Sequence, residues 1–489
     1  MLEFLKREAN STYTENGAVT NRCSESFCLD FFYQAGALRG ADDNSILTAF
    51  LRAYSEDPSL TMKILFFARD IRSGLGERRI FRTCMKWLAA NHPQSALKNL
   101  ELIPEFGRYD DLLSLLDTSC EKAVMEHIAR QLAADTKAMQ AGDQNISLLA
   151  KWLPSVNTSN EQTVKYAKKI ARALKLTDAA YRKTLSGLRK YIDILENHLR
   201  ESDYTFDYEK QASKAMFKYR KAFIRNDKER YISFIEKVHS GEAVLKTSSL
   251  YPYDIIRSAI NDNLTKEEAM ALDASWKSLT AYGNGENAIA VVDGSGSMYA
   301  VSGTVSPKPY EAALSLGIYF AEHNKGRFAN HFITFSESPR LVEIRGRDIV
   351  EKARYAASFN EVANTNLEAV FQLILNTAVK YRLPQAELPD KIFIISDMEF
   401  DRCTHHAGLS NFENAKRLFQ NKGYRLPQVI FWNVQSRNEQ VPVTKKECGA
   451  AIVSGSSPKI FDMVKSGDLD PMKLMLEIVE SERYQMISA

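Results

Sequence analysis

The 489-residue sequence lacks long apolar stretches and has few cysteines. Its longest apolar runs, Ile64–Ala68 and Ala288–Val292, contain five residues each, whereas a membrane-spanning helix needs about 20. No CxxC pair occurs among the six cysteines, and the gap between Cys23 and Cys28 is wider than in the ligand pairs of zinc sites. The sequence therefore excludes a membrane-spanning protein and gives no reason to expect disulfides. We expect a protein with reduced thiols in the cytoplasm.

The chain also has little net charge, because 64 Lys and Arg nearly balance 61 Asp and Glu. This balance excludes a uniformly basic coat, and 45% hydrophobic residues exclude wholesale disorder. The charge is nevertheless uneven: residues 151–250 contain 21 Lys and Arg and 12 Asp and Glu, a net charge of +9, with tyrosines between the cations. Basic and aromatic residues together are typical of surfaces that bind phosphates and stack bases. Alternatively, the cations solvate helix faces and the tyrosines belong to the core.

The periodicity of the apolar residues divides the chain near Tyr282–Glu286. Before this point they recur at three- and four-residue spacing, which predicts an array of amphipathic helices. After it, short β-rich runs alternate with helical segments, which predicts a mainly parallel sheet with helices on both faces. We therefore predict an α-helical repeat domain over residues 1–284 and a doubly wound, Rossmann-like α/β domain over residues 285–489.

Six strands are predicted in the α/β half: Ala288–Val292, His331–Phe335, Leu341–Ile344, Lys391–Ser396, Val429–Val434 and Ala451–Val453. The second and third are joined by a turn too short for a crossover, so we expect an antiparallel hairpin at a sheet edge. Helices are predicted to begin near Pro309, Asn366, Phe412, Pro458 and Pro471.

The first of these strands continues directly into the loop Asp293-Gly-Ser295-Gly-Ser297. Ligands of open α/β sheets bind at the carboxyl ends of the strands, and two glycines allow the three oxygen-bearing side chains to converge. Such donors suit a hard divalent cation. Thr365 precedes a predicted helix, and Asp397 follows the strand Lys391–Ser396, so both are expected at the same edge.

Together, Asp293, Ser295, Ser297, Thr365 and Asp397 resemble the metal-ion-dependent adhesion site of von Willebrand factor A domains. The resemblance extends over the α/β half, including the order of strands and helices and the edge hairpin. It implies a bound Mg²⁺, or else Mn²⁺ or Ca²⁺. It also implies a partner protein that donates a carboxylate to the ion.

Other interpretations of these residues remain open. The glycine-rich loop could be a polar turn, and Thr365 with Glu368 fits a helix capping box. If the strand continued, Asp397, Glu399 and Asp401 would share one face and could hold metals for phosphodiester hydrolysis. A second alternative places a transition metal on a short loop containing Cys403, His405 and His406.

In the helical half, Gly74 and Gly76 are expected to turn one helix into the next. Their turn carries four arginines, Arg69, Arg72, Arg78 and Arg79, which could bind phosphates or pair with Asp70, Glu77, Asp110 and Asp111. Two further motifs follow, Phe106-Gly-Arg-Tyr-Asp-Asp111 and Lys151-Trp-Leu-Pro154. These motifs, with the order of the two halves, resemble a family of unknown function and the TROVE module of Ro autoantigen and telomerase-associated proteins.

The Ro resemblance implies a ring of helical repeats that binds single-stranded RNA ends and small structured RNAs. On this basis we expect a non-enzymatic RNA-binding scaffold. The expected RNA contacts are Arg69, Arg72, Arg78, Arg79, Lys151, Lys168, Lys169 and Arg172. A protein-interaction adaptor without nucleic acid is the alternative from another class.

Overall fold

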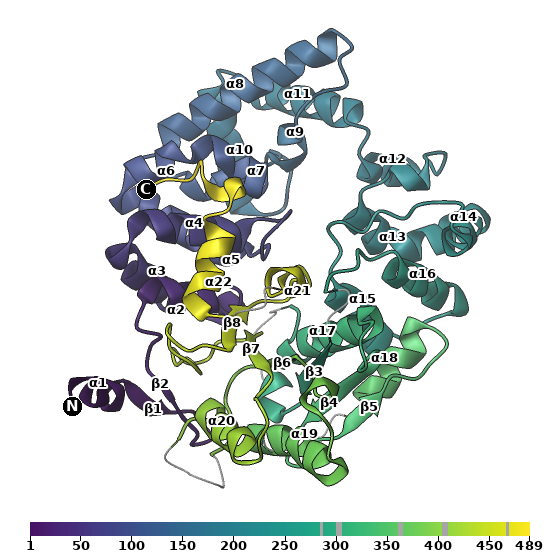
Figure 1. The fold of residues 1–489 in the computed structure, drawn as a ribbon. Coiled ribbons are helices and arrows are strands. Elements are labelled where there is room, and N and C mark those ends of the chain that lie inside the picture. The colour runs from purple at the N-terminus through teal and green to yellow at the C-terminus, as the bar shows by residue number, and fades with distance from the viewer. Residues whose placement is uncertain (284–286, 300–305, 360–364, 403–408, 466–468) are drawn as a thin grey trace.

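A computed structural model describes residues 1–283, 287–299, 306–359, 365–402, 409–465 and 469–489. The chain runs round a ring, in which an arc of helices leaves an α/β unit at one side and returns to it at the other (Figure 1). The predicted fold class, a helical array followed by a doubly wound α/β unit, is confirmed.

The helices of the arc begin at residues suited to capping. The side chains of Asp57, Asn160, Thr177 and Thr265, for example, each accept a hydrogen bond from a backbone N–H in the first turn of a helix. None of the described helices is both long and apolar enough to cross a membrane. In chain order the helices are α1 (Leu2–Asn10), α2 (Phe27–Ala35), α3 (Asp43–Glu56), α4 (Pro58–Arg69), α5 (Arg78–Asn91), α6 (Pro93–Lys98), α7 (Ile103–Phe106), the 3₁₀ helix η3 (Tyr109–Leu115), α8 (Glu121–Gln140), α9 (Leu149–Trp152), α10 (Glu161–Ala173), α11 (Asp178–Tyr191), α12 (Leu195–Glu201), α13 (Ser213–Asn226), α14 (Lys228–Ser240), α15 (Pro252–Asn261) and α16 (Lys266–Lys277).

The α/β unit is built on a six-stranded sheet with the order β5-β4-β3-β6-β7-β8. Every neighbouring pair is parallel except β4 and β5, which form the predicted antiparallel edge hairpin. In the centre, Val291 of β3 pairs with Ile333 of β4 and Ile394 of β6. The strands are β3 (Ala288–Asp293), β4 (His331–Phe335), β5 (Leu341–Glu343), β6 (Lys391–Ser396), β7 (Gln428–Asn433) and β8 (Ala450–Ser454). All six predicted strands are therefore present.

Among the described residues, the α-helices of the α/β unit are the five predicted ones and one more. Sequence reasoning missed α18, a short helix whose N-terminus is capped by Asp348. Helix α17 is buried around nearly its whole circumference, because it lies against the sheet and also against α15 of the arc. The helices are α17 (Pro309–His323), α18 (Ile349–Ala357), α19 (Leu367–Tyr381), α20 (Asn411–Asn421), α21 (Ile460–Met463) and α22 (Pro471–Val479).

Two sets of contacts close the ring. At one end, α2 packs on the edge strand β8, where the N–H of Gly36 donates to Ser454 Oγ at 2.9 Å. A Cβ atom on Gly36 would lie 2.5 Å from the carbonyl carbon of Ser454, so this close approach requires glycine. At the other end, α15 packs on α17 and α18, and Arg354 Nε donates to the carbonyl oxygen of Ala259 at 2.9 Å.

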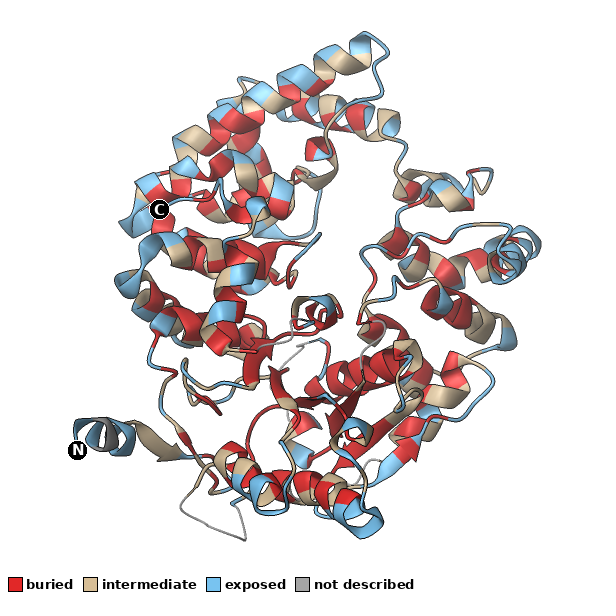
Figure 2. Cartoon of the chain, in the orientation of Figure 1, coloured by how far each residue is buried: buried red, intermediate tan, exposed pale blue. Residues whose placement is uncertain are grey.

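The hydrophobic core crosses the division seen in the sequence (Figure 2). One cluster of buried residues includes α2 to α11, α15 and the α/β unit, while a smaller cluster holds together α12, α13, α14 and part of α16. The C-terminal residues return to the arc, where the ring of Tyr484 stacks on Phe106 at 5.6 Å and Arg483 pairs with Asp70. The two halves are thus one packed structure.

Candidate functional site

The candidate cation site lies at the carboxyl edge of the sheet, between two central strands. Asp293 is the last residue of β3, and Asp397 directly follows β6, which pairs with β3 in parallel. Both carboxylates are buried. Ser295 follows in the loop after β3 and Ser297 in the short 3₁₀ helix η5 (Gly296–Tyr299), and their hydroxyl oxygens lie 3.0 Å apart.

Asp293 is held rigidly at this edge. Its carboxylate accepts hydrogen bonds from the N–H of Ser295 at 2.8 Å and from the hydroxyl of Ser396 at 2.5 Å. Burial, together with the nearby charge of Asp397, raises the pKa of Asp293 to about 7. A bound cation would relieve the unfavourable negative charge that the buried Asp293 carboxylate meets at this edge.

Thr365 is brought to the same edge, and its role differs from helix capping. The N-cap of α19 is Asn366, whose side chain accepts from the N–H of Ala369. The capping-box interpretation of Thr365 and Glu368 is therefore wrong. The hydroxyl of Thr365 instead donates to the carbonyl oxygen of Glu399 at 2.7 Å, two residues beyond Asp397.

The donors at this edge fit a hard divalent cation. They comprise the carboxylates of Asp293 and Asp397 and the hydroxyls of Ser295, Ser297 and Thr365, all of them oxygen ligands. The Oδ2 atom of Asp397 is buried and has no hydrogen-bond partner in the described part of the chain. In the same part, no group of three or more His, Cys, Asp or Glu side chains is arranged to hold a metal, so a cation here would depend on the hydroxyls.

The hydrolase alternative requires β6 to continue, and it does not. The strand ends at Ser396, and Met398 has a φ of 68° that breaks the alternation of Asp397, Glu399 and Asp401. The other alternative, based on Cys403, His405 and His406, falls outside the described residues.

Sequence reasoning missed an N-terminal hairpin that covers this edge. Strands β1 (Ser11–Tyr13) and β2 (Val19–Asn21) pair in an antiparallel manner, and Gly17 between them forms a bridge with Asp401. The Asn16-Gly17 dipeptide is a turn signal that could have located the turn of the hairpin. Its location on the site could not be predicted from that signal.

The hairpin contacts the site through specific hydrogen bonds. The side chain of Asn16 donates to the hydroxyl of Thr365 at 3.1 Å and to the carbonyl of Glu399 at 2.7 Å. The guanidinium of Arg437 forms two ion pairs, 2.9 Å from Glu15 Oε2 and 3.2 Å from Asp397 Oδ2, and neither contact is aligned as a hydrogen bond.

The predicted RNA contacts fall into three groups. Arg69 is buried and its guanidinium pairs with Asp111 at 2.7 Å, so it cannot reach a ligand on the surface. Four others contact carboxylates, namely Arg78, Arg79, Lys151 and Lys169. The remaining three have no carboxylate within ion-pair distance among the described residues, and these are Arg72, Lys168 and Arg172.

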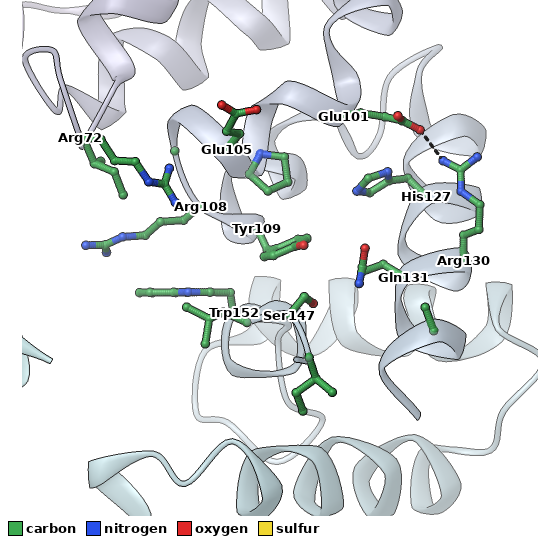
Figure 3. Close-up of a pocket in the computed structure, with 16 residues that line it drawn as sticks. Arg72, Glu101, Glu105, Arg108, Tyr109, His127, Arg130, Gln131, Ser147 and Trp152 are labelled. Atoms are coloured by element: carbon green, nitrogen blue, oxygen red, sulfur yellow. Dashed lines mark hydrogen bonds and ion pairs between the residues drawn. The ribbon is translucent and has the colours of Figure 1, made fainter. Parts of the chain in front are cut away.

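Arg72 lines a pocket of about 740 Å³ between the turn after α4, α7, η3, α8 and α9 (Figure 3). The guanidinium of Arg108 lies over the ring of Trp152, 4.6 Å from its centre, and Tyr109 lines the same space. In Figure 1, α7 and α9 face the middle of the ring. Sequence reasoning singled out the stretches containing Arg108 and Trp152 as motifs but did not bring them together.

His127 of α8 completes the pocket wall. Its side chain is 9% exposed, and neither ring nitrogen has a hydrogen-bond partner among the described residues. Burial lowers the pKa of His127, which favours the neutral imidazole with one donor and one acceptor nitrogen. The pocket therefore combines guanidinium groups, aromatic faces and an unsatisfied imidazole with two carboxylates, of which Glu101 pairs with Arg130 and Glu105 is the other.

The chain belongs to the family described as Domain of unknown function (DUF2828), whose model matches residues 14–128 and 120–282, more than half of the chain. A second model, described as Domain of unknown function (DUF7788), matches residues 287–483. No von Willebrand factor A family model matches. Neither family description states an activity.

Two individual proteins are similar over most of the chain. The uncharacterized protein L728 of Acanthamoeba polyphaga mimivirus is 29% identical over 514 residues, which cover 96% of this chain and 88% of the relative. The crystal structure of Deinococcus radiodurans RO (RSR) protein aligns with 94% of this chain and 100% of its own, with a TM-score of 0.45 and 15% identity.

Proposed function

We propose that this chain is a non-enzymatic RNA-binding scaffold of the cytoplasm. The observation that carries the proposal is the pocket formed by Arg72, Arg108, Tyr109, His127 and Trp152. Guanidinium groups bind phosphates, and aromatic rings stack on bases whatever the sequence. A wall that offers both within one cavity suits a single-stranded nucleic acid better than a purely apolar or purely acidic ligand.

Further support comes from α10 and α11, in the segment with a net charge of +9. Several exposed cations on these helices and in the turn between them have no carboxylate within ion-pair distance among the described residues, and they are Lys168 and Arg172 on α10, Lys175 in the turn, and Arg182, Lys183 and Lys190 on α11. Cations that are not neutralised by the protein are available to phosphates, and their release of counterions makes such binding sensitive to salt. Single-stranded ends or small structured RNAs are the proposed ligands.

The α/β unit adds a proposed site for Mg²⁺, or else Mn²⁺ or Ca²⁺. Asp293, Ser295, Ser297, Thr365 and Asp397 would hold the ion. With the three neutral hydroxyls as direct ligands and the two aspartates acting through water, the bound ion would keep much of its positive charge and attract a carboxylate from a partner protein. In this proposal the ring binds RNA and its α/β unit recruits protein.

A second candidate function is a protein-interaction adaptor that binds no nucleic acid. The contact between the N-terminal hairpin and the cation site favours it, because Glu15 and Asn16 already occupy this edge as a peptide ligand would. This candidate explains the α/β edge but gives no role to the basic and aromatic pocket.

Filter binding of a labelled single-stranded RNA separates the two functions. An RNA scaffold retains the RNA at low salt, and its affinity falls with a slope of about −0.7 in log K against log salt for each phosphate contact. An adaptor without nucleic acid shows no retention at any salt concentration.

A further inference from the structure

The hairpin formed by β1 and β2 lies across the edge that carries the candidate cation site. Besides the Gly17 and Asp401 bridge, Val19 forms a bridge with Ser410, and Asn21 forms one with Val441. These three β-bridges join the hairpin to three separate segments of the α/β unit, which a loosely associated loop would not do. The hairpin is thus docked in one register, which determines where its turn residues lie.

Glu399 holds the turn of the hairpin in place. Its carboxylate accepts hydrogen bonds from the N–H of Glu15 at 2.7 Å and from the side chains of Asn438 and Gln440. Asn438 also donates to the carboxylate of Glu15 at 3.1 Å. The Glu15 side chain is therefore positioned by its own backbone and by a neighbour.

A single cation already connects Glu15 with the site. Arg437 lies between the carboxylates of Glu15 and Asp397, at 2.9 and 3.2 Å. The Asp397 oxygen that faces the guanidinium is buried and makes no hydrogen bond in the described part of the chain, so this carboxylate is poorly satisfied. These two carboxylates therefore face a single positive group, and a divalent ion could take over the charge that this group supplies.

We propose that Glu15 is the carboxylate that completes the coordination shell of the cation within the same chain. Arg437 competes with the ion for the same two carboxylates. The inference rests on the proposed cation site. It adds that a carboxylate from a partner must displace Glu15, so the N-terminal hairpin and the partner compete for one position.

The test is a Mn²⁺ titration of the full chain in which electron paramagnetic resonance measures free Mn²⁺. Glu15→Gln removes the charge with little change of shape, and this side chain is about half exposed, so folding should be preserved. We expect Glu15→Gln to weaken Mn²⁺ binding at least tenfold. Arg437→Gln should strengthen it at least tenfold, because the competing guanidinium is gone. The matched controls Glu8→Gln on α1 and Arg417→Gln on α20, both exposed, should bind as the parent does.

The outcomes separate this inference from the cation site itself. An unchanged Mn²⁺ affinity in Glu15→Gln overturns the assignment of Glu15, provided that the parent binds and Asp293→Ala does not. Absence of Mn²⁺ binding in both the parent and Arg437→Gln overturns the cation site and this inference together. Weaker binding in Glu15→Gln and tighter binding in Arg437→Gln support it.

Discussion

The guanidinium of Arg69 is buried against the carboxylate of Asp111, with Arg69 Nε 2.8 Å from Asp111 Oδ2. The same carboxylate accepts from Arg82 Nε at 2.6 Å and from the N–H of Arg108 at 3.0 Å. Asp111 therefore neutralises a buried charge and also sets the backbone from which Arg108 reaches over Trp152. A core ion pair supports the pocket that we propose for RNA.

Removal of Asp111 should be strongly destabilising. Asp111→Ala leaves Arg69 as a buried charge without its carboxylate, and we expect the free energy of unfolding to fall by about 3–5 kcal/mol. Urea unfolding followed by circular dichroism measures the change. Glu101→Ala is the matched control, because Glu101 pairs with Arg130 on the surface. Removal of this exposed ion pair should lower the free energy of unfolding by less than about 1 kcal/mol. Equal costs in the two variants would contradict a structural role for the buried pair.

The closure of the ring at Gly36 gives a second prediction. Gly36→Ala places a Cβ atom 2.5 Å from the backbone of Ser454, and the required displacement should cost about 1–3 kcal/mol. Gly187→Ala within α11 meets no atom within 4 Å and should instead stabilise by up to about 1 kcal/mol. Thermal unfolding of both variants checks the difference. A Gly36→Ala protein as stable as the parent would show that α2 and β8 are not in close contact.

The proposed cation site predicts a metal-dependent stability. A cation that binds only the folded chain stabilises it by about 2.7 kcal/mol at a concentration of 100 times Kd. Mg²⁺ or Mn²⁺ should therefore raise the Tm of the parent but not of Asp293→Ala or Ser295→Ala. Glu343→Ala on the edge strand β5 should respond as the parent does. A variant of Asp293 that keeps the full metal response would exclude this site.

The exposed cations of α10 should contribute to the salt dependence of RNA affinity. Lys168→Ala with Arg172→Ala removes two exposed cations, and at about 0.7 per phosphate contact the slope of log K against log salt should become less steep by about 1.4. The measurement is RNA affinity across a range of KCl concentrations. Lys473→Ala on α22, whose lysine contacts Glu477, should leave the slope unchanged. An unaltered slope in the double variant would place RNA elsewhere on the molecule.

The sheet could be predicted from the sequence because its central strands are apolar runs buried on both faces. Lys391–Ser396 is such a run, and every residue of β6 is buried. Asp293 and Asp397 could be placed at one edge for a related reason, because parallel strands bring their carboxyl ends together. The full set of five follows from the resemblance to a metal-ion-dependent adhesion site, and only the structure shows that β3 and β6 are neighbours.

The rest depends on contacts between residues far apart in the chain. The hairpin strands have three residues each, too few for a periodic signal, and their docking relies on Glu399 and Asn438 hundreds of positions away. From its sequence neighbourhood, Arg69 is predicted to contact phosphate. The fold shows instead that Arg69 is buried and paired with Asp111. Local patterns cannot distinguish a buried arginine from an exposed one.

The most direct test of RNA binding is filter retention of a labelled single-stranded RNA by the parent and by Arg72→Ala with Arg108→Ala. The double variant removes two guanidiniums of the pocket, and Arg182→Ala with Lys183→Ala removes two exposed cations of α11 as the control. We predict retention by the parent at about 50 mM salt that weakens steeply toward about 200 mM. We also predict at least a tenfold loss of affinity in the pocket variant and a smaller loss in the control. No retention by the parent at about 50 mM salt would contradict the RNA-binding function. Equal affinity of the parent and the pocket variant would contradict the role of the pocket.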